Sequence, residues 1–160
     1  MIKWIIRTTM LLSLGLFFTL LPAGSSPLWA VELSAGQTLY VPAYSHIYIG
    51  HRSRPYNLSI TLSIRNVNTK TAITVTTVDY HDTDGNLSKH FLDAPVVLGP
   101  MATTRYVVPI QKNAGGSGAN FVVRWQADHR VNPPIVESVM IGTQSQQGIS
   151  FTSRGQEIKE

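Results

Sequence analysis

The stretch from Asn57 to Ile110 constrains this chain most, because apolar and polar residues alternate there between two turn signals. The run LSITLSIR, which begins at Leu58, places an apolar side chain at every second position. Side chains alternate between the two faces of a strand, so this run predicts a half-buried β-strand. The next run begins at Ile73 and changes phase part-way, which predicts a β-bulge near Thr76–Thr77. Together these runs predict an antiparallel β-meander.

The sequence HDTDGN (His81–Asn86) joins the second run to a further strand over Leu87–Leu92. Asp-Gly between two strands is typical of a tight hairpin, because glycine accepts a positive φ without steric cost. The same alternation or short apolar runs between Gly and Pro predict strands elsewhere. These are Gln37–Pro42, Ser45–Gly50, Val96–Leu98, Tyr106–Ile110, Phe121–Ala127, Ile135–Ile141 and Gly148–Phe151.

Many short strands without sustained helical periodicity predict an all-β fold. We expect a single antiparallel β-sandwich, immunoglobulin-like in architecture, with a small β-barrel as the alternative and no helix beyond the N-terminal segment. Trp125 is expected in the core. Glu137 shares a face with apolar neighbours, which suggests an edge or a wet end of its strand, and Thr152–Glu160 resembles a frayed tail.

Residues 1–30 have the layout of a secretory signal peptide, with a basic start, the apolar run Met10–Leu21 and a small-residue exit that ends at Ala30. The alternative is a retained membrane anchor, although the apolar run is shorter than the roughly 20 residues of a spanning helix. We therefore expect cleavage after Ala30, one domain over residues 31–160, and a periplasmic or secreted protein that no longer contacts the membrane.

Charge and cysteine content exclude several classes of function. Without Lys3 and Arg7 the formal charge falls from +4 to +2, and the remaining basic residues are scattered, so a nucleic-acid partner is not expected. The chain has no cysteine. Disulfides, thiolate metal sites, thiol nucleophiles and a lipid-modified cysteine anchor are therefore all excluded.

The hairpin sequence HDTDGN also offers metal ligands. Asp82 and Asp84 precede a glycine, as in calcium loops, and His81 and His90 flank the same turn, as zinc or copper ligands can. The downstream acidic ligands of a calcium loop are missing, and no HxH or HExxH spacing occurs. The structural interpretation is a hairpin that the aspartate caps. A divalent metal is therefore the alternative to a protein without a cofactor.

The glycine-rich run QKNAGGSGAN has two interpretations besides a plain loop. Its backbone N–H groups could hold an anion, with Gly116, Ser117 and Asn120 as candidate ligand-binding residues. Ser117 with Asp128 and His129 would alternatively form a hydrolase triad, although a strand rather than a helix follows the serine.

Tyrosine and arginine gather near the start of the domain, in the section that runs from Tyr40 to Tyr56. Such a mixture is favoured at interfaces with proteins, peptides or glycans. The alternative is tyrosines that pack over the end of the sandwich. The candidate partner-binding residues here are Tyr44, Tyr48, Arg52 and Arg54.

Seven stretches resemble a bacterial family known as Domain of Unknown Function family 3124. They are LYVPAYSHIY (Leu39–Tyr48), LSIRN (Leu62–Asn66), VDYHDTDG (Val78–Gly85), PMAT (Pro100–Thr103), GGSGANF (Gly115–Phe121), PIVESVMIGT (Pro134–Thr143) and QQGISF (Gln146–Phe151). The resemblance covers nearly all of residues 31–160 and implies an exported bacterial domain. It implies no activity and no catalytic residues.

These observations together predict a non-catalytic binding or interaction module of the bacterial periplasm or cell envelope. Its partner would be an envelope protein, a peptide or a glycan. The alternatives are a metal-binding domain built on the His81–His90 hairpin and a small serine hydrolase.

Overall fold

The computed structural model describes residues 32–49, 54–110, 115–144 and 146–159. The chain divides into two compact units, Met1–Ala30 and Val31–Glu160, and the predicted signal peptide lies outside the described residues. Within the described ranges, no helix has the length and apolar character needed to cross a bilayer.

The described part of the domain consists of β-strands and the turns between them. In chain order the strands are β1 (Ser34–Pro42), β2 (His46–Ile49), β3 (Arg54–Asn57), β4 (Ser59–Arg65), β5 (Ile73–His81), β6 (Leu87–His90), β7 (Val96–Leu98), β8 (Thr103–Val108), β9 (Asn120–Val131), β10 (Ile135–Gln144), β11 (Gln147–Arg154) and β12 (Gln156–Ile158).

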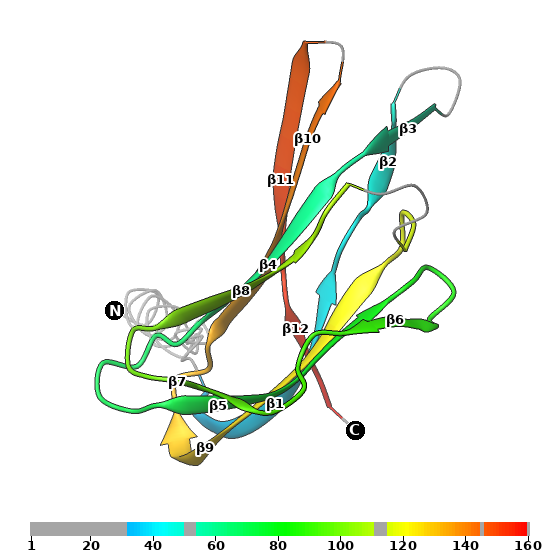
Figure 1. The fold of residues 1–160 in the computed structure, drawn as a ribbon. Coiled ribbons are helices and arrows are strands. Elements are labelled where there is room, and N and C mark those ends of the chain that lie inside the picture. Colours follow the sequence, from blue (N-terminus) through cyan, green and yellow to red (C-terminus); the bar gives the residue numbers. More distant parts are fainter. Residues whose placement is uncertain (1–31, 50–53, 111–114, 145, 160) are drawn as a thin grey trace, which may run out of the picture. The chain divides into compact units, whose positions relative to one another are not determined.

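Two antiparallel sheets face each other and enclose the core (Figure 1). The first has the order β12-β1-β9-β5-β6, with β7 also paired to β5, and the second has the order β11-β10-β4-β8. Strands β2 and β3 form a separate hairpin. The sheets do not close on themselves, so the predicted β-sandwich is confirmed and the barrel alternative is wrong.

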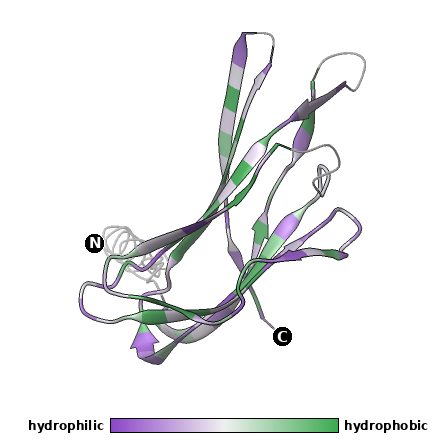
Figure 2. Ribbon diagram, viewed as in Figure 1, coloured by the Kyte–Doolittle hydropathy of each residue, from purple (hydrophilic) through white to green (hydrophobic). Residues whose placement is uncertain are grey.

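The core follows from the alternation in the sequence (Figure 2). Every second residue of β4 from Ile60 to Ile64 is completely buried, as are Phe121 and Val123 on β9. Trp125 is only 2% exposed, and its indole Nε1 donates a hydrogen bond to the Gln37 side chain at 3.3 Å. The placement of Trp125 in the core is therefore confirmed.

The predicted bulge lies on β5 where it pairs with β9. The register between the two strands shifts between Val75 and Thr77. Val75 and Val78 are both buried although they are three residues apart, which strict alternation would not allow. The extra residue of the bulge brings both side chains to the core face.

The C-terminal segment differs from the prediction of a frayed tail. Strand β11 continues to Arg154, and β12 then pairs with β1 in the other sheet. Gly155 marks the crossing, and its N–H donates to the Val136 carbonyl at 2.8 Å. The tail is ordered because it completes an edge of the first sheet, and a three-residue strand carries almost no pattern of its own.

Strand β10 is not an edge strand, since it lies between β11 and β4. Glu137 is on its outer face, where its carboxylate lies 3.4 Å from Nε of Arg65. Of the two predicted positions, an edge or a wet end of the strand, the edge is wrong, and Glu137 lies half-buried near the start of β10.

Buried amides close the end of the sandwich where β4 leads into β5. Asn66 is 2% exposed, and its Nδ2 donates to the carbonyls of Thr71, Leu98 and Gly99 at 2.8, 3.1 and 2.9 Å. Its Oδ1 accepts from the N–H of Asn68 at 3.0 Å. One side chain thus ties two turns together, and the opposite end of the sandwich is left to hold the site described next.

Candidate functional site

A cleft of about 830 Å³ lies between the β2–β3 hairpin and the turn that joins β5 to β6. Residues from three separate segments of the chain line it. They are His46, Tyr48, Pro55, Asn57, Asp82, Thr83, Asp84, Gly115 and Gly116.

One face of the β2–β3 hairpin forms the first wall. His46 pairs with Asn57 and Tyr48 with Pro55, so these four side chains share the face that lines the cleft. Tyr48 is 59% exposed. His46 holds it in place, since Nε2 lies 3.3 Å from the tyrosine oxygen and the two rings meet edge to face at 5.2 Å. The wall therefore presents an aromatic ring in a defined orientation.

The other face of this hairpin points toward the protein. Tyr56 is buried, and its hydroxyl donates to the carbonyls of Gly142 and Gln147 at 3.0 and 2.8 Å. These bonds join the hairpin to the end of β10 and the start of β11. The face of the hairpin opposite the cleft thus anchors the first wall to the rest of the domain.

The turn Asp82–Asn86 forms the second wall. Oδ1 of Asp82 accepts from the N–H groups of Asp84 and Asn86 at 3.0 and 2.8 Å, and Oδ2 accepts from the Asn86 side chain at 3.2 Å. The side-chain and backbone hydrogen bonds from Asn86 hold the pKa of Asp82 below its usual value. Gly85 has a φ of +84°. The aspartate-capped hairpin is therefore what the sequence HDTDGN forms.

Asp84 differs from Asp82 in its bonding. Its carboxylate makes no hydrogen bond or ion pair to any residue that the structure describes. An exposed carboxylate thus lines the cleft with its acceptor oxygens available to a ligand.

Thr83 binds the glycine-rich loop to this turn. Its N–H and its Oγ1 both donate to the Gly115 carbonyl, at 2.8 and 2.9 Å, and Oγ1 accepts from the N–H of Gly118 at 3.1 Å. Ser45, at the start of the β2–β3 hairpin, exchanges hydrogen bonds with Gly116: its Oγ accepts from the Gly116 N–H at 2.8 Å, and its N–H donates to the Gly116 carbonyl at 3.0 Å. The loop therefore joins the two walls.

The glycines of this loop are required by close packing. Gly115 and Gly116 have φ values of +102° and +97°, which residues with a side chain rarely adopt. A Cβ at Gly115 would overlap the hydroxyl of Tyr80, and one at Gly116 would overlap Oγ1 of Thr83. Burial raises the pKa of Tyr80 to about 12, and the nearby charge of Asp82 adds to the effect. The loop is thus a packed element rather than an open anion cradle.

The structure separates the residues predicted for partner binding. Tyr48 and Gly116 line the cleft. Tyr44 instead packs edge to face against Phe151, with ring centroids 5.7 Å apart. Arg54 pairs with Ile49 and so lies on the hairpin face opposite Tyr48.

Asn120 and Ser117 do not line the cleft. Asn120 pairs with His81 at the start of β9, and Ser117 follows the two glycines without lining the cleft. Arg52 lies outside the described residues. Of the predicted aromatic-basic residues that the structure describes, Tyr48 lines the cleft, whereas Tyr44 and Arg54 do not.

The structure also separates the residues predicted as metal ligands. Asp82 and Asp84 line the cleft, whereas Nδ1 of His90 lies 2.7 Å from Oδ1 of Asp79, within hydrogen-bond distance. Nδ1 of His81 is buried and has no hydrogen-bond partner among the described residues. Within the described ranges, no group of three or more His, Cys, Asp or Glu is arranged to hold a metal ion. No observation favours the metal alternative.

The hydrolase triad does not assemble. Nε2 of His129 lies 3.4 Å from Oγ1 of Thr71, beside the start of β5, whereas Ser117 precedes the start of β9. The nine residue steps of β9 from Asn120 to His129 span about 30 Å. Ser117 and His129 therefore lie at opposite ends of the strand.

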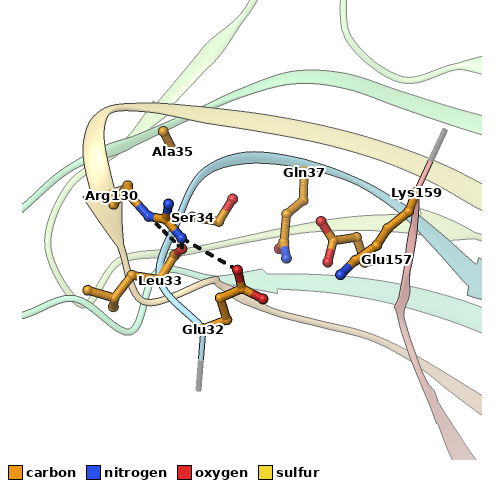
Figure 3. Close-up of a pocket in the computed structure, with 8 residues that line it drawn as sticks. All are labelled: Glu32, Leu33, Ser34, Ala35, Gln37, Arg130, Glu157 and Lys159. Carbon is orange, nitrogen blue, oxygen red and sulfur yellow. Dashed lines mark hydrogen bonds and ion pairs between the residues drawn. The ribbon is translucent and has the colours of Figure 1, made fainter. Parts of the chain in front are cut away.

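A smaller hollow of about 330 Å³ lies where the domain begins (Figure 3). Arg130 dominates it: Nε and Nη2 donate to the Leu33 carbonyl at 3.0 and 2.7 Å, and Nη2 lies 3.5 Å from the Glu32 carboxylate. Glu157 and Lys159 line it from the side of β12. The guanidinium of Arg130 is already engaged within the chain, so this hollow anchors the start of β1.

The sequence reasoning missed most of the cleft. His46 and Tyr48 stand two residues apart in a predicted strand, and that spacing alone places them on one face. No local sequence pattern indicated the roles of Thr83 and Ser45, because their hydrogen-bond partners lie 32 or more residues away in the chain.

No curated protein matches the chain. Among solved structures it is similar to the Thermotoga maritima protein 1070, at 15% identity and a TM-score of 0.41, over 75% of this chain and 92% of that one.

Three of the stretches quoted for the family resemblance meet at the cleft: Leu39–Tyr48 supplies part of the first wall, Val78–Gly85 the second wall, and Gly115–Phe121 the loop between them. The model of one family matches residues 36–158, which is most of the chain. The chain belongs to the family described as "Protein of unknown function (DUF3124)".

Proposed function

We propose that this chain is a non-catalytic binding module of the bacterial periplasm or cell envelope, and that the cleft beside Tyr48 and Asp84 is its binding site. The observation that carries the proposal is the cleft itself. An exposed aromatic ring and a carboxylate without a partner among the described residues face a hollow of about 830 Å³, which is within the range of ligand-binding sites.

The construction of the cleft supports binding as its role. Hydrogen bonds from Tyr56, Thr83 and Ser45 hold the two walls and the loop between them. A site whose walls are fixed before the ligand arrives loses less conformational entropy on binding. The hydroxyl of Thr83 already donates to Gly115, and it is thus committed to the fold rather than poised as a nucleophile.

The N-terminal segment supports the proposed compartment. Its basic start, apolar run and small-residue exit are those of a cleaved export signal. Expression of the full coding sequence in a bacterium, followed by osmotic release and N-terminal sequencing, tests this. We expect a periplasmic protein that starts at Val31. A protein that begins at Met1 and stays with the membrane fraction would contradict export with cleavage.

Binding is tested by quantitative capture from an envelope extract on immobilised protein. The cleft variant carries Tyr48→Ala and Asp84→Asn. Its matched control carries Tyr40→Ala and Asp93→Asn, two exposed positions outside the cleft lining. We expect a ligand that the wild type and the control retain and the cleft variant loses. Equal capture by all three proteins would refute the cleft as the binding site.

A further inference from the structure

The charged side chains that line the cleft indicate the charge of its ligand. Among the described residues that line the cleft, the carboxylates are those of Asp82 and Asp84, and none is Lys or Arg. Hydrogen bonds keep Asp82 ionised, and Asp84 has no partner among the described residues. The face of an exposed tyrosine ring such as Tyr48 attracts cations as well. The cleft therefore favours a positively charged group and disfavours phosphorylated or acidic ligands.

The backbone of β2 offers a second kind of contact. The segment before it runs beside the glycine-rich loop, since the N–H of Ala43 donates to Ala119 at 2.9 Å and that of Ser45 to Gly116 at 3.0 Å. Within the described residues β2 pairs with β3 alone. Among the described residues, one edge of β2 is thus unpaired on the side of the cleft.

The register shows which backbone groups this edge presents. The N–H of Leu58 donates to the Ser45 carbonyl at 2.9 Å, and hydrogen-bonded pairs alternate with non-bonded ones in an antiparallel ladder. Pro55 has no N–H, so the Tyr48–Pro55 pair is a non-bonded one. The N–H and C=O groups of His46 and Tyr48 consequently point outward.

The opposite edge of the hairpin is protected. Pro55 has no backbone N–H, so the outer edge of β3 lacks one hydrogen-bond donor. Proline on an edge strand commonly prevents the addition of another strand. Gly142 also packs closely against the Asn57 carbonyl, where a Cβ would come within 2.6 Å. Strand addition is thus directed to β2, beside the cleft.

We propose that the cleft binds an extended peptide segment that carries Lys or Arg and adds as a strand to the free edge of β2. This inference rests on the proposed binding function and names its ligand class. A peptide residue opposite Tyr48 has its side chain on the same face as the tyrosine, where the Asp84 carboxylate also lies. Main-chain hydrogen bonds then supply affinity, and the basic side chains supply specificity.

The test uses fluorescein-labelled nonapeptides and fluorescence anisotropy with the protein expressed from its full coding sequence. The probe alternates Thr and Lys, and its partner alternates Thr and Glu. We expect binding of the Thr-Lys peptide that weakens with added salt, and none of the Thr-Glu peptide. Tyr48→Ala and Asp84→Asn should each weaken binding about two- to fivefold. Tyr40→Ala and Asp93→Asn should leave it unchanged.

N-methylated probes test strand addition separately. Residues opposite His46 and Tyr48 exchange both backbone hydrogen bonds, so N-methylation of the Lys residues should abolish binding and N-methylation of the Thr residues should not. Equal effects of the two methylations, or equal binding of the Thr-Glu peptide, would overturn the inference. Cleft-dependent capture of a neutral glycan without binding of Thr-Lys would overturn it too, while the proposed function would stand. Loss of cleft-dependent capture altogether would remove both.

Discussion

Replacement of Gly116 by alanine tests whether the glycine-rich loop holds the cleft together. A left-handed backbone costs a residue with a side chain about 1–2 kcal/mol, and Gly116 has a φ of +97°. The new Cβ would also overlap Oγ1 of Thr83, and overpacking of this kind adds about 1–3 kcal/mol. We therefore expect Gly116→Ala to lower the free energy of unfolding by about 2–5 kcal/mol, or Tm by on the order of 10 °C.

Denaturant unfolding followed by Trp125 fluorescence measures this change, because Trp125 is buried in the core. Gly148→Ala is the matched control, since a Cβ at Gly148 would meet no atom within 4 Å and the backbone there has no positive φ. It should leave stability unchanged or raise it by about 0.4–1 kcal/mol. A Gly116→Ala protein within about 0.5 kcal/mol of the wild type would refute the reasoning, because substitutions away from special features have effects of that size.

A double-mutant cycle isolates the contact from the backbone strain. Thr83→Ala removes the oxygen that the new Cβ would meet. In that background Gly116→Ala should keep only the conformational part of its effect, and the coupling energy should be about 1–3 kcal/mol. A coupling near zero would show that the loop shifts away from Thr83 without cost.

Three further perturbations have expected results. Asn66→Ala should lower the free energy of unfolding by about 2–4 kcal/mol, because it leaves buried carbonyls without donors, whereas the exposed Thr69→Ala should change it by less than about 0.5 kcal/mol. The pKa of Tyr80 is raised to about 12, so the folded state keeps a proton that the unfolded state releases near pH 10, and stability should fall by about 1.4 kcal/mol per pH unit between these values. Urea titrations from pH 9 to 11.5 measure this slope, which Tyr80→Phe should flatten. The pKa of Asp82 is lowered, so its contribution is present above the unfolded value near 3.9 and is lost as the pH falls through the lower folded value. The fall in the free energy of unfolding below pH 4 should therefore be less steep in Asp82→Asn. An unchanged pH dependence below pH 4 would contradict the capping role.

The two ends of the sandwich are built differently, and this difference bears on function. Buried amides close the end at Asn66, where the side-chain amide donates only to groups inside the protein. At the other end Tyr48 is exposed and Asp84 is unpaired among the described residues. Binding sites are expected where polar or aromatic groups on a rigid scaffold lack partners, because loops held by a scaffold carry most binding residues.

Local physics explains why the strands and turns could be predicted. The alternation of β4 and β9 follows from strand geometry alone, and Trp125 was placed in the core by that pattern. The cap of Asp82 on its own turn involves bonds across no more than four residues. The bulge on β5 was visible because two apolar runs are out of phase in the sequence.

The partners of these elements were decided only in the tertiary structure. The pattern of β10 shows a wet face but does not reveal that two strands flank it, and β12 is too short for its pairing with β1 to be recognised. Thr83 meets Gly115 across 32 residues, and the choice between that contact and any other depends on how the two sheets pack. The sequence by itself determined an all-β chain with a capped hairpin and a glycine-rich loop. Only folding brought that hairpin, that loop and Tyr48 around one cleft, because side-chain alternation specifies the face of a strand and carries no information about which distant segment will lie beside it.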